Sequence, residues 1–130
     1  MEETAAAIFK KDSKILLEKR REDEDNYAGF WALPGGHKKE EETPEEALVR
    51  EMKEELNVTV KKFKFIGKFE DRDPTSKKMY THHSFLCEEW EGEIKQTTEQ
   101  EKIEWIKIKE LENLNIHPVD LKMLKAAKVL

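Results

Sequence analysis

The segment "TPEEALVREMKEELNV", residues 43–58, constrains the fold more than any other part of the chain. Thr43 is a suitable helix N-cap, Pro44 suits the first helical position, and Glu46 completes a capping box. Four apolar residues recur at helical spacing and should share one face: Leu48, Val49, Met52 and Leu56. The sequence therefore predicts an amphipathic helix that begins at Pro44 and packs against a core.

Runs typical of β-strands lie on both sides of this helix. Strands are expected at residues 4–9, 15–19, 31–33, 58–68, 79–90 and 102–108, with a short continuation at Ile94, and "EDRDPTSKK" should form a loop. In the last strand we expect Ile103 and Trp105 to face the core, and Ile106 is a further candidate. A second helix should begin near Pro118. The pattern predicts an α+β fold built around a sheet, as one domain over residues 1–130.

Composition excludes several classes of function. The net charge of -5 argues against general binding of nucleic acid, which needs a basic surface. No apolar run reaches the roughly 18 residues of a membrane span, and the first residues do not resemble a signal peptide, so a cytoplasmic protein without a membrane partner is expected. The one cysteine, Cys87, cannot form an internal disulfide and fits a core strand better than a nucleophile.

Three glutamates of the predicted helix lie within one arc beside its apolar stripe. They are Glu51, Glu54 and Glu55. Like charges at this spacing repel by a few tenths of a kcal/mol each, so their convergence favours a bound cation. Mg²⁺ is the natural choice because it prefers oxygen ligands, and Mn²⁺ is the alternative. A solvated helix face with ordinary ion pairs remains open on this spacing alone.

The spacing of charged residues extends beyond the helix. Gly36 is followed after five residues by Glu42, and after seven more by "REMKEELNV", residues 50–58. This resembles the Nudix hydrolase signature G-x5-E-x7-R-E-U-x-E-E-x-G-U, in which U is aliphatic. The one departure at a fixed position is Asn57, where the family usually has Gly. Asn tolerates the left-handed conformation expected there better than other residues with a side chain. Glu41 also replaces a frequent Gly.

The resemblance covers most of the chain and is closest to the MutT-type nucleoside triphosphate pyrophosphohydrolases. The segments "ILLEKR", "FWALPGG", "CEEWEGE" and "EWIKIKEL" resemble that group in the same order. The resemblance implies an α/β/α sandwich with a mixed sheet, in which the signature forms a loop, a helix and a loop. It also implies hydrolysis of a nucleoside diphosphate linked to another moiety, by attack of water on phosphorus.

The resemblance assigns roles to individual residues. The implied metal ligands are the carbonyl of Gly35 and the side chains of Glu51, Glu54, Glu55 and Glu99. Arg50 should lie between Glu42 and Glu51 and orient both through charge-assisted hydrogen bonds. Glu51 is the preferred general base, with Glu54 as the alternative. Arg20, at the end of the second strand, is expected to contact the nucleotide.

The substrate remains open between a nucleoside triphosphate, which could be an oxidised one, and ADP-ribose. Pro74, sixteen residues past the signature, is typical of ADP-ribose pyrophosphatases, whereas the base-recognising Asn of MutT-type proteins has no clean counterpart. Ile116 occupies its position and Asn115 is one residue away. Three aromatic residues are candidates for stacking on a base: Tyr27, Phe30 and Trp31. A nucleotide-binding module without catalysis is a third alternative. The sequence does not decide the oligomeric state, for which a homodimer is one possibility.

Overall fold

The structure is a computed structural model that describes residues 2–22, 27–96 and 102–130. Its elements are β1 (Glu2–Lys11), β2 (Lys14–Lys19), β3 (Trp31–Ala32), β4 (Gly35–His37), α1 (Pro44–Leu56), β5 (Thr59–Arg72), β6 (Met79–Glu91), β7 (Lys102–Lys107), the 3₁₀ helix η1 (Ile108–Asn113) and α2 (Pro118–Ala126). The strands follow the order β3-β2-β1-β6-β5, while β4 pairs with β1 and β7 pairs with β2. Since β1 and β6 are parallel and the other pairs are antiparallel, the sheet is mixed.

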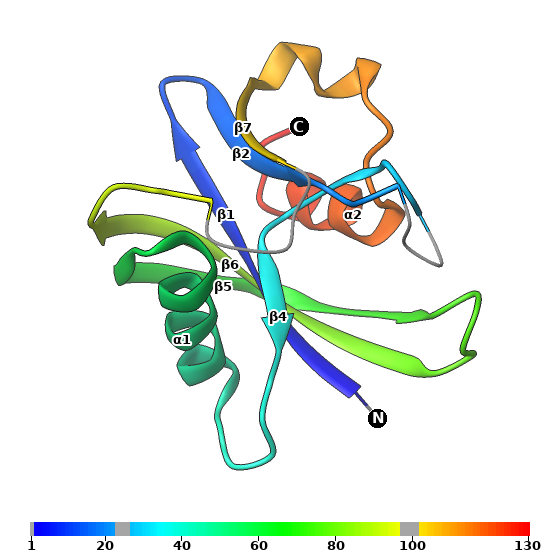
Figure 1. Cartoon of the computed structure of the whole chain (residues 1–130). Coiled ribbons are helices and arrows are strands. Elements are labelled where there is room, and N and C mark those ends of the chain that lie inside the picture. The colour runs from blue at the N-terminus through cyan, green and yellow to red at the C-terminus, as the bar shows by residue number, and fades with distance from the viewer. Residues whose placement is uncertain (1, 23–26, 97–101) are drawn as a thin grey trace.

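The two α-helices cover opposite faces of the sheet (Figure 1). Successive side chains of a strand point to opposite faces, and β1 divides its apolar residues in this way. Ala5, Ala7 and Phe9 belong to the cluster beneath α1, whereas Ala6 and Ile8 belong to the cluster beneath α2. The expected α/β/α sandwich with a mixed sheet is therefore confirmed.

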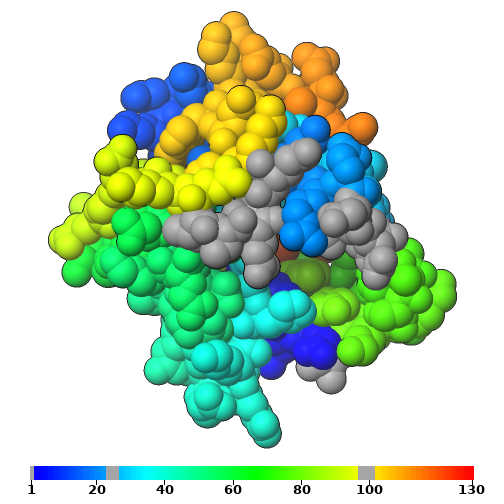
Figure 2. Space-filling view, viewed as in Figure 1, coloured from blue at the N-terminus to red at the C-terminus, as the bar shows by residue number. Residues whose placement is uncertain are grey.

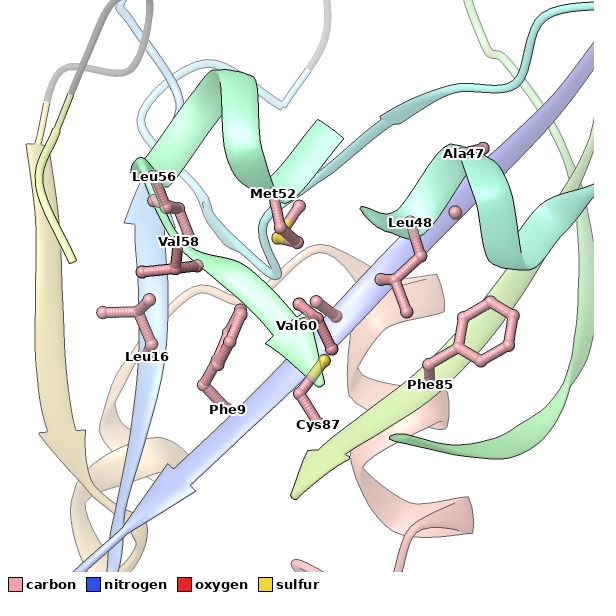
Figure 3. Packing of buried hydrophobic residues seen from close by; sticks show 12 residues of the cluster. Phe9, Leu16, Ala47, Leu48, Met52, Leu56, Val58, Val60, Phe85 and Cys87 are labelled. Carbon is pink, nitrogen blue, oxygen red and sulfur yellow. The ribbon is translucent and has the colours of Figure 1, made fainter. Parts of the chain in front are cut away.

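The apolar face of α1 forms the first of these cores. Leu48, Met52 and Leu56 are fully buried and face the strand residues Phe9 and Phe85 (Figure 3). Burial of each such side chain contributes about 1.5–3 kcal/mol. Cys87 is buried in the same core, and burial raises the pKa of its thiol to about 12, as expected of a packing residue.

Both ends of α1 match the sequence prediction. The N–H of Glu46 donates to Thr43 Oγ1 at 3.1 Å, and the N–H of Thr43 donates to Glu46 Oε1 at 2.8 Å, which completes the capping box. At the other end Asn57 has φ 62° and ψ 31°, the left-handed conformation, and its N–H donates to the carbonyl of Lys53. The substitution of Asn for the usual Gly therefore preserves the helix end.

This conformation predicts opposite effects for two replacements of Asn57. Asn57→Ala should lower the free energy of unfolding by about 1 kcal/mol, because a Cβ without a compensating polar group is strained at positive φ. Asn57→Gly should leave it unchanged or raise it. Urea unfolding followed by circular dichroism would measure both. Equal stability of the two variants would contradict the assignment of strain at this position.

Two sequence expectations about the strands were wrong in detail. The expected loop begins later, because β5 continues through residues 70–72 and pairs with β6 up to the register Arg72↔Met79; this pairing outweighs the polar composition. Ile94 forms no strand and instead packs, partly buried, against the first core. The expectation for β7 is confirmed: Ile103 and Trp105 pack, partly buried, against the first core, and the further candidate Ile106 is buried in the second. The 3₁₀ helix η1 was not predicted.

The described helices are also too short and polar to cross a membrane: none combines the necessary length and hydropathy.

Candidate active site

Arg50 organises the charged residues of the signature. Its Nε and Nη2 donate to the two carboxylate oxygens of Glu42 at 2.6 and 2.9 Å. Its Nη1 donates to Glu51 Oε1 at 2.9 Å and to Glu54 Oε2 at 3.2 Å, and Nη2 also reaches the carbonyl of His37 at 2.9 Å. Arg50 thus lies between Glu42 and Glu51, the placement expected from the sequence, and joins α1 to β4 and to the loop before the helix.

The electrostatics of this cluster follow from these bonds. The guanidinium of Arg50, and then the N–H of Lys39 at 2.8 Å, hold the pKa of Glu42 at about 2, so this carboxylate is ionised at neutral pH. The carboxylates in turn raise the pKa of Arg50. A lysine could not make the same paired contact, because it lacks the planar fork of donors.

Two glycines of β4 allow the sheet and the helix to approach closely. A Cβ added to Gly36 would clash with the carboxylate of Glu51, whose Oε1 it would meet at 2.6 Å. A Cβ added to Gly35 would clash with the carbonyl oxygen of Ala5 on β1. The missing side chain of Gly35 therefore serves the pairing of β4 with β1, and it is Gly36 that lets Glu51 lie against the backbone of β4. The sequence did not indicate this role of Gly36.

The carboxylates of α1 fit a divalent cation by their chemistry. Glu51 and Glu55 are half-buried and Glu54 is exposed, and their oxygens are ligands that Mg²⁺ prefers. Glu51 and Glu54 bind Arg50, and Glu55 follows Glu51 by one helical turn. Within residues 2–22, 27–96 and 102–130, no three acidic, histidine or cysteine side chains are gathered closely enough to form a metal-binding group. The convergence expected from the helical wheel is thus incomplete: Arg50 Nη1 binds both Glu51 and Glu54, but these carboxylates form no group of three with another described ligand side chain. Glu99 lies outside the described residues.

A cleft of about 550 Å³ opens on the face of the sheet away from α1. One end is formed by the β4 residues Gly35 and Gly36, next to the Glu51 carboxylate. The other end is formed by Arg20, Tyr27, His117 and Asp120, among others. Figure 2 shows the surface hollowed between β4, in cyan, and the green β5–β6 hairpin. This volume is within the range of small-molecule sites. The end of the cleft formed by Gly35 and Gly36 lies next to Glu51, a residue of the signature.

Of the residues that the sequence suggested for substrate contact, some line the cleft and others do not. Arg20 lines it, and so does Tyr27 among the three aromatic candidates. Trp31 instead belongs to the second core and is 9% exposed. Ile116 is buried in the same core, and the exposed Asn115 uses its carbonyl to accept from the N–H of Trp31. Neither of these last two residues lines the cleft, so the position of the MutT-type Asn has no equivalent here.

Two cleft residues at the start of α2 were missed by the sequence interpretation. Asp120 accepts a hydrogen bond from the N–H of Leu33 at 2.9 Å, and burial raises its pKa to about 7. His117 caps α2 by accepting from the N–H of Val119 at 3.3 Å, and burial lowers its pKa to about 4. A signal existed for Asp120, because it stands four residues before the buried Leu124, on the apolar face of the helix.

Three polar side chains in the lining of the cleft form a hydrogen-bonded chain. Thr4 Oγ1 lies 2.6 Å from His82 Nδ1, and His82 Nε2 lies 2.7 Å from Asp71 Oδ1. The three residues come from β1, β6 and β5, which are neighbours in the sheet. These three side chains add polar groups to the lining of the cleft.

The chain is similar in sequence to several known proteins. A CTP pyrophosphohydrolase of Escherichia coli is 29% identical over 126 residues, which cover 97% of this chain and 90% of that protein. An 8-oxo-dGTP diphosphatase of the same species is 34% identical over 89 residues, 68% of this chain and 67% of that protein. An ADP-ribose pyrophosphatase of Methanocaldococcus jannaschii is 46% identical over 69 residues, 52% of this chain and 40% of that protein.

The fold has close counterparts as well. The solution structure of the E. coli ORF135 protein superimposes with a TM-score of 0.84 at 28% identity, covering all of this chain and 90% of that one. A family model described as the NUDIX domain matches residues 1–127. The signature, the helix that carries it and these matches together show that the chain belongs to the Nudix family and is a Nudix hydrolase.

Proposed function

We propose that this Nudix hydrolase cleaves a nucleoside triphosphate to a nucleoside monophosphate and pyrophosphate, with Mg²⁺ as cofactor and Mn²⁺ as the alternative. The observation that supports this most is the cleft, which runs from the Gly36 backbone beside Glu51 to a buried polar end at Asp120 and His117. A substrate with its phosphates at the first end and its base at the second would use both.

The residues of α1 and β4 would act on the phosphates. Glu51, Glu54, Glu55 and the Gly35 carbonyl, with Glu99 as a further ligand, would hold the ion, which would neutralise phosphate charge when bound. Arg50, bonded to Glu42 and Glu51, would keep these carboxylates in place during turnover. Glu51 is our choice for the base that accepts the proton of the attacking water, with Glu54 as the alternative. Arg20 would contact the nucleotide from the far end of the cleft.

ADP-ribose is the second candidate substrate. Pro74 lines the cleft, and the relative that bears the name ADP-ribose pyrophosphatase has the higher identity over a shorter segment. We favour a triphosphate because the relative named CTP pyrophosphohydrolase aligns with nearly the whole chain. A binding module without catalysis would not need all four signature glutamates.

A panel of substrates with MgCl₂ tests the proposal. Ribonucleoside and deoxyribonucleoside triphosphates, 8-oxo-dGTP and ADP-ribose would be incubated with the enzyme, and the products separated by anion-exchange chromatography. We expect a monophosphate and pyrophosphate from at least one triphosphate. Hydrolysis of ADP-ribose alone would replace the proposed substrate class, and binding of nucleotides without any product would favour the binding module.

A further inference from the structure

Lys38 is a largely buried lysine in the loop before α1. It directly follows β4, and its side chain is only 13% exposed. Its Nζ lies 3.5 Å from Glu3 Oε2 and donates to the carbonyl of Lys39 at 3.2 Å. Burial of a lysine costs free energy unless the charge is paired, so the position of this ammonium group depends on the carboxylate of Glu3.

Glu3 is held in turn by the neighbouring strand β6. Its Oε1 lies 2.8 Å from Nε2 of His83, whose side chain is 5% exposed. The hydrogen bond with His83, and then the charge of Lys38, lower the pKa of Glu3 against the effect of burial, so the carboxylate is ionised at neutral pH and His83 is the donor. The N–H of Lys38 also donates to the carbonyl of Glu3 at 2.9 Å. Lys38 is therefore attached to the sheet through its backbone and its side chain.

The peptide groups of Lys39 connect Lys38 to the signature. The carbonyl that accepts from Lys38 Nζ also accepts from the N–H of Glu42 at 3.1 Å. The N–H of Lys39 donates to Glu42 Oε1 at 2.8 Å, and the same oxygen accepts from Arg50 Nη2 at 2.9 Å. A continuous series of polar contacts thus runs from the sheet, through Lys38 and the turn at residues 39–42, to Arg50.

We propose that Lys38 is a positioning residue for hydrolysis: paired with Glu3, it fixes the turn at residues 39–42 so that Glu42 holds Arg50 in place. This deepens the proposed function and rests on the part that it gives to Glu42 and Arg50. Without the ammonium group, the Lys39 carbonyl would lose a donor and Glu3 would lose a cation beside it. The turn would then be less firmly attached to the sheet.

Lys38→Met tests this proposal, because it removes the charge and the donors but keeps a long side chain. Arg50 also bonds to Glu51, so a displaced Glu42 should disturb the carboxylates that act on the phosphates. Every residue that lines the cleft is unchanged. We therefore expect kcat to fall about tenfold and KM to stay within about twofold in steady-state hydrolysis of the best triphosphate. Lys38→Arg, which keeps a charge and donors, should restore kcat to within about threefold of the wild type.

A double-mutant cycle shows whether Lys38 acts through Glu42. In a Glu42→Gln background, Lys38→Met should lower kcat by less than about twofold further, because the contact that it supports is already weakened. A general loss of stability would instead slow both backgrounds by the same factor. Equal factors in the two backgrounds would overturn the proposal.

Lys61→Met is the matched control. Lys61, on β5, is 51% exposed and lies 3.8 Å from Glu91, so the same chemical change removes an ion pair elsewhere on the sheet and should leave kcat unchanged. Thermal melting would show that the variants are folded. If Lys38→Met does not fold, Glu3→Gln provides the test: it removes the charge beside Lys38 at nearly constant volume and should lower kcat at least about threefold.

The Nε–H of Arg50 gives a readout that needs no substrate. It donates to Glu42 Oε2 at 2.6 Å, so its signal in a ¹H–¹⁵N NMR spectrum should shift in Lys38→Met and stay in place in Lys61→Met. If the signal responds in this way but the wild type hydrolyses no triphosphate, the positioning of Arg50 by Lys38 is supported and the proposed function is wrong. If triphosphates are hydrolysed and Lys38→Met keeps the wild-type kcat or the wild-type signal, the inference is wrong and the proposed function stands.

Discussion

Replacing Glu54 or Glu55 by glutamine should reduce turnover at least about 100-fold. Both residues lie within one helical turn of the half-buried Glu51 on α1, and a neutral amide would be a much poorer ligand for Mg²⁺ than a carboxylate. Folding should be retained, because Glu54 is exposed and Glu55 is half-buried, at the edge of the core. Steady-state hydrolysis of the best triphosphate from the substrate panel would measure the effect.

Glu45→Gln is the matched control for these variants. Glu45 is an exposed glutamate in the first turn of the same helix, outside the Arg50 cluster, so the same chemical change there should leave turnover within about twofold. Calorimetric titration with Mg²⁺ in the absence of nucleotide would separate weaker metal binding from a defect in the chemical step. Near wild-type rates in both Glu54→Gln and Glu55→Gln would overturn the metal assignment.

The parts of the fold that follow local rules could be predicted from the sequence. The capping box at Thr43, the buried stripe of α1 and the left-handed Asn57 depend on residues close together in the chain, and all three are present. Strand ends were less predictable. The hydrogen bonds of β6 extend β5 over a segment whose composition is typical of a loop, so pairing across the β5–β6 hairpin outweighs the local composition.

The cleft could not be predicted, because it depends on contacts between distant segments. Arg20, Asp71 and Asp120 meet only when β2, β5 and α2 pack around the same sheet. The aromatic residues show the same limit: Tyr27 and Trp31 are equally plausible as stacking partners in the sequence, yet one lines the cleft and the other fills a core. An acid on the apolar face of a helix, as at Asp120, is the type of local conflict that marks functional residues.

Gly36→Ala should lower turnover about 100-fold, the effect of displacing a catalytic group by roughly 1 Å. The added Cβ would overlap the carboxylate of Glu51, which must then leave its place against β4. Arg50 couples that movement to Glu42 and Glu54, since the same guanidinium bonds to all three glutamates. The substitution should therefore disturb the whole cluster without removing any of its charges.

Gly67→Ala is the control, because a Cβ there would lie 3.4 Å from the ring of Phe69, within ordinary contact, on a strand away from the cluster. It should keep wild-type turnover, while both glycine variants should retain the circular dichroism spectrum of the native fold. Full activity in Gly36→Ala would show that the position of Glu51 against β4 does not matter for hydrolysis. Loss of activity in Gly67→Ala as well would mean that general changes to the sheet, and not the displaced carboxylate, explain the effect.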